Sequence, residues 1–245
     1  MSEIKQAMIL AAGMGSRMKE LTHDIPKPML LVSGTSLIER HLNYLYKNDI
    51  HKVIINTHYK AETLEKFVLS LPIAKKLEIY FSREEELLGT AGGVKNALKY
   101  LGKEPFFIIN SDAIYVDDDI KHSAFSQLEE NWRLNNMSML ILLATKNRVF
   151  GYYGKGDFNM NEHKQLVLDK ENGEFIHIGM TITDYRIFKN HPEKVLQFQN
   201  IYQDFMLKDE IYGYIYQGQW LHIGDIRAYN EAPALISPSP DTVSI

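Results

Sequence analysis

A glycine-rich loop with two nearby cations is the first feature of the sequence that could do chemistry. Gly13 and Gly15 directly follow a short apolar run, and glycines there let backbone N–H groups approach phosphate oxygens. Arg17 closes the loop, and Lys27 stands between two prolines that fix its backbone. The loop matches neither the dinucleotide fingerprint, because Met18 replaces a glycine, nor the Walker motif. A plain strand-to-helix turn is the alternative, but the two cations favour a polyphosphate site.

A single carboxylate and a second glycine-rich segment add to these groups. Asp112 follows the apolar run 106–110, where a carboxylate suits a hard cation better than a protein core. The segment 88–93 (Leu-Gly-Thr-Ala-Gly-Gly) could hold a ligand at a helix N-terminus. Thr90 is placed to cap a helix that runs to Leu101. The alternatives are a turn or cap role for Asp112 and a plain helix start at segment 88–93.

Alternating strand and helix patterns must position these groups. Apolar runs bounded by polar residues or glycine predict strands, and apolar residues at helical spacing predict helices. This alternation predicts an α/β fold with a doubly wound sheet, in which ligands lie beyond the carboxyl ends of the strands. The predicted strands are 6–12, 52–56, 77–81 (nearer a sheet edge), 106–110 and 139–143, and the helices begin after the Ser36–Glu39 capping box, at Ala61 and at Thr90.

The second half of the chain has weaker patterns. Strands are predicted at 179–183 and 211–216, and a helix from His191 to Met206. A single domain is expected over residues 1–235. The serine- and proline-rich residues 236–245 predict a poorly ordered tail.

The overall composition disfavours several classes of function. The 245 residues are 45% hydrophobic and 24% charged, as in a globular protein. The net charge of −4 disfavours nucleic acid binding. Because cysteine is absent, disulfides, thiolate catalysis and cysteine-bound metals are excluded. We expect no signal peptide and no membrane span, and therefore a cytoplasmic protein that binds neither membranes nor nucleic acid.

The order and spacing of these motifs resemble the sugar-1-phosphate nucleotidyltransferases. The likeness extends over nearly the whole chain, to about Leu235. The family implies a Rossmann-like, mixed, mostly parallel sheet of the GT-A type in one catalytic domain, with a nucleotide-binding half (about 1–145) and a sugar-binding half (about 146–235). It also implies a reaction between an NTP and a sugar-1-phosphate that gives an NDP-sugar and pyrophosphate. The matching segments are Leu10 to Met18, Pro26 to Met29, Leu88 to Gly92, and Asp112.

The resemblance implies roles for individual residues. Arg17 would hold the triphosphate and the leaving pyrophosphate, and Lys27 would neutralise the α-phosphate and the sugar phosphate in the transition state. Asp112 would bind Mg²⁺, with Mn²⁺ as the alternative. The remaining implied contacts are Leu10, Ala11, Ala12, Gly13, Met14, Gly15, Glu84, Gly89 and Thr90 to the nucleotide, and Asn110, Gly156 and His177 to the sugar.

One position departs from the family pattern at a metal ligand. The family usually ends Trp-x-Asp-x-Gly, and that Asp is the second metal ligand, but this chain has His222 there. His222 could bind a softer metal such as Mn²⁺, Co²⁺ or Zn²⁺, or Asp225 could take its place, or Asp112, phosphates and water could hold Mg²⁺ alone. The last two together are favoured. A lesser departure is Ser111, where a glycine usually precedes the Asp.

Details of the second half bear on the substrate. Segments 154–158 and 220–224 most resemble the uridylyltransferases that act on N-acetylmuramate α-1-phosphate, a cell-wall sugar, and mannose-1-phosphate guanylyltransferases come next. Glu84 falls where members of the family read the base, and its carboxylate could accept from uracil or guanine, so UTP and GTP both remain open.

Two other functions and the oligomeric state also remain open. One alternative is a cytidylyltransferase for phosphocholine, whose quaternary ammonium could be caged by tyrosines. The other is a non-catalytic subunit that binds a nucleotide-sugar. A monomer or a small homo-oligomer is expected. The tyrosines considered for the cage are Tyr152, Tyr153, Tyr212, Tyr214 and Tyr216.

Overall fold

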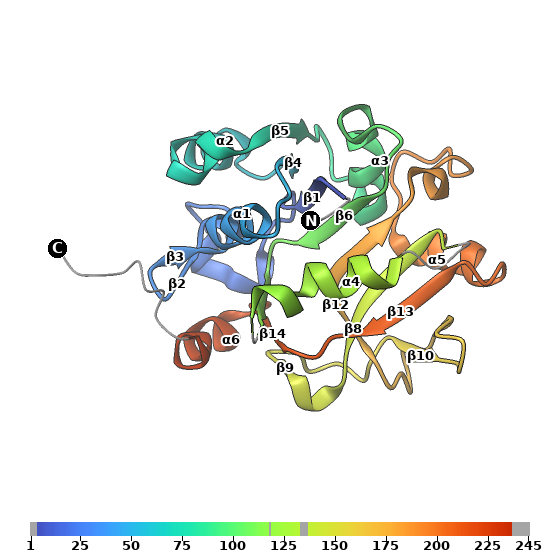
Figure 1. Cartoon of the computed structure of the whole chain (residues 1–245). Helices are drawn as coiled ribbons and strands as arrows, with labels where there is room; N and C mark the ends of the chain where they lie inside the picture. The colour runs from blue at the N-terminus through green and yellow to red at the C-terminus, as the bar shows by residue number, and fades with distance from the viewer. Residues whose placement is uncertain (1–3, 118, 133–136, 237–245) are drawn as a thin grey trace.

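The computed structural model describes residues 4–117, 119–132 and 137–236, which are built around a seven-stranded sheet (Figure 1). Of these seven strands, β12 alone runs antiparallel to its neighbours. The predicted α/β fold with a mixed, mostly parallel sheet is therefore confirmed. The strands in spatial order are β13 (Ile211–Ile215), β8 (Met139–Ala144), β12 (Ile176–Thr183), β6 (Phe106–Asn110), β1 (Gln6–Leu10), β4 (Lys52–Thr57) and β5 (Glu78–Arg83).

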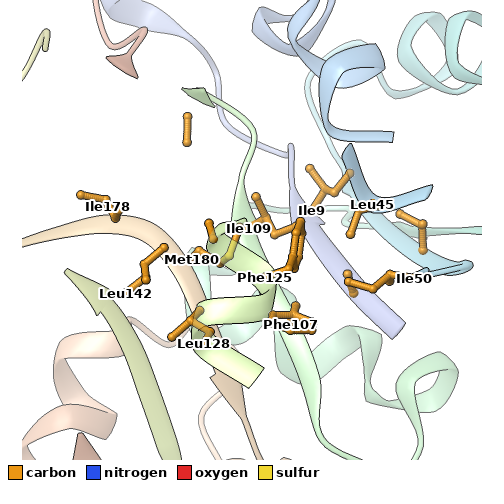
Figure 2. Close-up of a cluster of buried hydrophobic side chains, with 14 of the residues drawn as sticks. Ile9, Leu45, Ile50, Phe107, Ile109, Phe125, Leu128, Leu142, Ile178 and Met180 are labelled. Carbon is orange, nitrogen blue, oxygen red and sulfur yellow. The ribbon is translucent and has the colours of Figure 1, made fainter. Parts of the chain in front are cut away.

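Helices cover both faces of this sheet. Because successive strand side chains point to opposite faces, Ile9 packs into one buried cluster with α1, α2 and α4, whereas Met8 packs into another with α3 and α5. Figure 2 shows Phe125 and Leu128 of α4 packed near Phe107 in the first cluster. The helices are α1 (Leu37–Lys47), α2 (Ala61–Ser70), α3 (Gly89–Leu101), α4 (Ala124–Trp132), α5 (Phe198–Met206) and α6 (Ile226–Glu231).

Two local predictions from the sequence are confirmed. The capping box starts α1, because the Ser36 hydroxyl oxygen accepts a hydrogen bond from the Glu39 backbone N–H at 3.2 Å. The strand expected nearer an edge is β5, which has only β4 as a neighbour in the sheet.

Two predicted helix starts are wrong. Thr90 does not cap α3, since the helix begins at Gly89 with Leu88 as its cap residue, and the Thr90 hydroxyl donates instead to Gln197. The helix predicted from His191 begins only at Phe198. His191 precedes a proline, which disfavours helical backbone, and the following loop pairs with the start of α3 through hydrogen bonds of Leu196 with Leu88 and with Gly92.

A second, three-stranded sheet joins segments that are far apart in the chain. It consists of β7 (Ala113–Val116), β14 (Gln219–His222) and β9 (Val149–Phe150), with β14 in the middle. The sequence patterns did not predict these strands. Two hairpins complete the strands, formed by β10 (Phe158–Met160) with β11 (Leu166–Leu168) and by β2 (Leu31–Val32) with β3 (Thr35–Ser36).

Strands from both expected halves of the chain, before and after residue 145, join the same seven-stranded sheet. Within the described ranges, no helix is long and apolar enough to cross a bilayer. Of the tail predicted at 236–245, only Ile236 belongs to the described residues.

Candidate active site

A cleft of about 490 Å³ lies at the carboxyl ends of β1, β4 and β6, where the fold predicts a ligand. It contains most of the expected nucleotide-binding residues. Met14 is an exception, because it lines a shallow hollow beside His23 and Tyr59 instead. Lining residues of the cleft include Leu10, Ala11, Ala12, Gly13, Gly15, Arg17, Lys27, Asn56, Glu84, Gly89, Thr90, Asn110, Asp112 and Gln197.

The glycine loop turns back toward Lys27. Gly15 has a φ of 64°, which favours glycine, and a Cβ there would lie 3.2 Å from the Cβ of Lys27 and 3.1 Å from Thr22. The Thr22 hydroxyl donates to the Gly15 carbonyl at 3.0 Å and closes the loop. The loop therefore brings its backbone beside the lysine.

Lys27 and Asp112 form an ion pair in the wall of the cleft. The Lys27 ammonium donates to Asp112 Oδ2 at 2.6 Å, and the two side chains are 11% and 20% exposed. Pro26 and Pro28 are both buried, so the lysine backbone is held on each side. Arg17 lines the same cleft and is exposed. The structure thus brings the three predicted charged residues to one cleft.

Asp112 is also next to His222. In the antiparallel pairing of β14 with β7, His222 lies opposite Ala113, so its ring reaches the carboxylate, with Nε2 3.4 Å from Oδ2. Burial alone would raise the pKa of the Asp112 carboxyl. The contact with His222 and the charge of Lys27 outweigh burial and hold this pKa well below its usual range. The carboxylate is therefore charged at neutral pH.

Asp225 has a structural task at the start of α6. Its carboxylate accepts a hydrogen bond from the Ala228 backbone N–H at 2.9 Å, and it is the cap residue of that helix. One of its oxygens is thus engaged away from Asp112, and its role as a metal ligand stays a prediction.

Glu84 links two segments of the cleft wall through hydrogen bonds. Its side chain is buried, with Oε1 accepting from the Asn56 amide at 2.7 Å and Oε2 from the Leu88 N–H at 3.1 Å. The Asn56 oxygen in turn accepts from the Ala11 N–H at 2.7 Å. Both Glu84 oxygens therefore already accept hydrogen bonds from protein groups. Recognition of the base by Glu84 stays a prediction. The sequence interpretation missed Asn56, although a polar residue that ends an apolar strand is the same signal that Asp112 gave.

Replacing Asn56 with alanine should destabilise the fold by about 2–3 kcal/mol. The change leaves the buried Ala11 N–H and one Glu84 oxygen without these partners, and an unpaired buried polar group costs about 1–3 kcal/mol. Urea unfolding measures the effect. Asn43→Ala is the matched control, because the Asn43 amide donates only within its own helix, to Glu39, and should cost less than about 1 kcal/mol. Equal losses in both variants would refute the network.

A second pocket of about 230 Å³ continues from the cleft. The two share Leu10, Thr90, Asn110 and Gln197. Of the expected sugar contacts, Asn110 and His177 line this pocket, whereas Gly156 does not. Gly156 is needed in the backbone, since a Cβ there would lie 2.0 Å from the Gly173 carbonyl oxygen.

Two polar groups of the second pocket are fixed by their neighbours. The Asp157 carboxylate accepts from the His177 backbone N–H at 3.0 Å. Burial lowers the pKa of His177, so its ring is neutral at pH 7. Its Nε2 lies 3.2 Å from the Thr181 hydroxyl. The sequence interpretation did not single out Asp157 or Gln197, and no local pattern marks Gln197.

The fold and the cleft place this chain among the α/β proteins whose ligand site lies beyond the carboxyl ends of parallel strands. More narrowly, the chain belongs to the Nucleotidyl transferase family, whose sequence profile matches residues 6–237. It is an enzyme of the sugar-1-phosphate nucleotidyltransferase group, so the resemblance noted in the sequence is confirmed.

Three relatives illustrate the range of the family. The chain is 30% identical to the N-acetylmuramate α-1-phosphate uridylyltransferase of Caulobacter vibrioides, over 95% of this chain and 97% of that one. It is 28% identical to the D-glycero-α-D-manno-heptose 1-phosphate guanylyltransferase of Campylobacter jejuni, over 89% and 94%. The crystal structure of HddC from Yersinia pseudotuberculosis complexed with GMP-PN superposes with a TM-score of 0.78 at 25% identity, covering 96% and 100%.

Proposed function

We propose that this enzyme transfers a uridylyl group from UTP to an amino sugar 1-phosphate such as N-acetylmuramate α-1-phosphate, releasing pyrophosphate. The observation that carries the proposal is the continuity of the two pockets, with the Lys27–Asp112 pair in the wall of the larger one. A nucleotide in the cleft and a sugar in the second pocket would meet with their phosphates near Lys27. The relative from Caulobacter vibrioides supports the uridylyl group and the sugar.

The reaction needs charge neutralisation and alignment rather than a protein nucleophile. A phosphate oxygen of the sugar-1-phosphate attacks the α-phosphorus of the NTP, and the bond to the β-phosphate oxygen breaks. Lys27 would bind the oxygens of the α-phosphate, where negative charge gathers in the transition state. Arg17 would bind the β- and γ-phosphates and the leaving pyrophosphate. The backbone of residues 10–15 would hold the base, ribose and phosphates.

The donor set fits a divalent cation. Asp112 is charged and lines the cleft, and carboxylate oxygen is a preferred ligand of Mg²⁺ and Mn²⁺. Within the described residues, no group of three or more His, Asp or Glu side chains is arranged around a common point. Phosphate and water oxygens would therefore supply most of the other metal ligands. The cation would supply positive charge that neutralises the phosphates of the NTP and of the sugar-1-phosphate.

A screen of nucleotides against phosphorylated acceptors tests this function. UTP, GTP, CTP and dTTP are each paired with N-acetylmuramate α-1-phosphate, N-acetylglucosamine 1-phosphate, mannose 1-phosphate or phosphocholine, and pyrophosphate release is followed with MgCl₂ and with MnCl₂. We expect the highest kcat/KM for UTP with N-acetylmuramate α-1-phosphate. Faster guanylyl transfer to mannose 1-phosphate would replace the substrate assignment, and no release with any pair would refute the proposal.

One cation in the wall of the second pocket could pair with an acceptor that carries a carboxylate. Lys170 is the one Lys or Arg among the described residues that line this pocket, and the lactyl group of N-acetylmuramate carries a carboxylate. Lys170→Gln should therefore raise KM for N-acetylmuramate α-1-phosphate about fivefold, the range of an exposed ion pair, and leave N-acetylglucosamine 1-phosphate unchanged. Lys155→Gln, which removes an exposed lysine paired with Glu171, is the control. Equal changes for both sugars would contradict this role.

The five tyrosines considered for a phosphocholine cage do not line the second pocket, whose aromatic rings, within the described part of the chain, are Phe158, Phe198 and Tyr202. A quaternary ammonium is bound by a cage of aromatic rings.

A further inference from the structure

The ring of His222 is held on two sides. Its Nδ1 lies 3.3 Å from the carbonyl oxygen of Gly151, and its plane stacks on the indole of Trp220 with an interplanar angle of 8° and a centroid distance of 5.3 Å. A carbonyl oxygen only accepts hydrogen bonds, so a hydrogen on Nδ1 would be donated to Gly151 and would hold the ring in this direction. Nε2 is thereby left to face the cleft wall at Asp112.

The side chains of His222 and Asp112 approach each other across a short gap. His222 Nε2 lies 3.4 Å from Asp112 Oδ2. This separation is longer than the 2.7–2.9 Å of a typical charge-assisted hydrogen bond. It lies within the span of two metal–ligand bonds of about 2.1 Å each. The gap would therefore admit a cation bound by both atoms.

The surroundings of His222 have the features of a metal-binding histidine. Such histidines usually donate their other ring N–H to a backbone carbonyl or a carboxylate, which fixes the tautomer and the ring direction. Here the Gly151 carbonyl is in that position. Gly151 has a φ of 74°, and a Cβ there would lie 2.3 Å from the His222 carbonyl oxygen, so this close approach requires glycine.

We propose that His222 Nε2 and the Asp112 carboxylate bind the same divalent cation, and that this chain therefore prefers Mn²⁺ or Co²⁺ to Mg²⁺. Imidazole nitrogen suits first-row transition metals, whereas Mg²⁺ prefers an all-oxygen shell. This assignment replaces the alternatives favoured from the sequence, Asp225 or Asp112 without a second protein ligand. It rests on the proposed function only in taking Asp112 as a metal ligand, and its test requires no turnover.

The first measurement uses the unaltered full-length protein. MnCl₂ is titrated into protein labelled with ¹⁵N-histidine, without nucleotide, and the ring signals are followed by NMR, with His222→Asp identifying the His222 signal. We expect the His222 ring to broaden at far lower MnCl₂ than His122, which forms an exposed pair with Asp119 at 3.0 Å. Broadening of both rings together, or none at His222, would overturn the proposal.

The second measurement compares metals. The EPR signal of free Mn²⁺ reports how much MgCl₂ displaces half of the bound Mn²⁺. The required excess of MgCl₂ should be about tenfold smaller for His222→Asp than for the unaltered protein, since a carboxylate oxygen suits Mg²⁺ better than an imidazole nitrogen does. His122→Asp is the matched control and should leave it unchanged. An equal excess for His222→Asp and the unaltered protein would leave His222 as an ion-pair partner only and refute the proposal, whether or not nucleotidyl transfer occurs.

Discussion

Replacing Lys27 with methionine should lower kcat for nucleotidyl transfer by a factor of about 10²–10³, with a much smaller change in the affinity for the nucleotide. Loss of a single preorganised donor to the charge of a transition state has effects of this size. The Lys27 ammonium is held for this task by two buried prolines and by the Asp112 carboxylate at 2.6 Å. Methionine keeps the length of the side chain and removes the charge.

Steady-state kinetics and nucleotide titration together check this result. A loss in kcat and kcat/KM of similar size indicates an interaction made only in the transition state, whereas a loss in affinity alone indicates ground-state binding. Lys19→Met is the matched control, because Lys19 is exposed and lines the hollow outside the cleft. A fall in kcat of less than tenfold for Lys27→Met, or an equal fall for Lys19→Met, would contradict the assigned role.

The sequence predicts the parts of the site that depend on strand ends. Gly13 follows β1 and Asp112 follows β6, and these neighbouring parallel strands end at the same edge of the sheet. Their convergence follows from the sheet rule alone. Asn56, at the end of β4, satisfies the same rule and could have been included.

The contacts made by the second half of the chain could not be predicted in this way. His222 reaches Asp112 through the pairing of β14 with β7, and both are strands of four residues. Such short strands give no reliable alternation, and their register depends on tertiary packing. Gln197 likewise reaches Thr90 from a loop 107 residues further along the chain.

The place of Glu84 in the cleft could be expected from the sequence, whereas its hydrogen-bond partners could not. The residue lies in the cleft, as the resemblance implies. Its two oxygens, however, accept hydrogen bonds from Asn56 and Leu88. The sequence reports that a carboxylate is present but not which donors reach it, because those donors come from β4 and from the start of α3.

Replacing Asp112 with asparagine should reduce kcat by about 10³ or more and make the residual activity insensitive to EDTA. A metal ion contributes several kcal/mol to charge stabilisation, which corresponds to this factor. The amide keeps the shape of the side chain but has no charge for the cation or for Lys27, so the variant loses the metal and the orientation of the lysine together. EDTA should stop the unaltered enzyme and change the residual rate of the variant little. Stimulation of Asp112→Asn by MgCl₂ or MnCl₂ to the same degree as in the unaltered enzyme would contradict the assignment.

The same substitution should change how stability depends on pH. Because the folded pKa of Asp112 lies well below its unfolded value of about 3.9, the charged carboxylate stabilises the fold above pH 4, and this contribution is lost as the pH falls toward the folded pKa. The difference in unfolding free energy between the unaltered protein and Asp112→Asn should therefore shrink as the pH is lowered from 7 to 3. Asp119→Asn is the control for an exposed pair: contacts with His122 also lower the pKa of Asp119, but solvent screens this pair, so its pH dependence should be smaller. If the difference for Asp112→Asn stayed constant over this range, its charge would contribute nothing to folding, and the paired Lys27 would be held by the prolines alone.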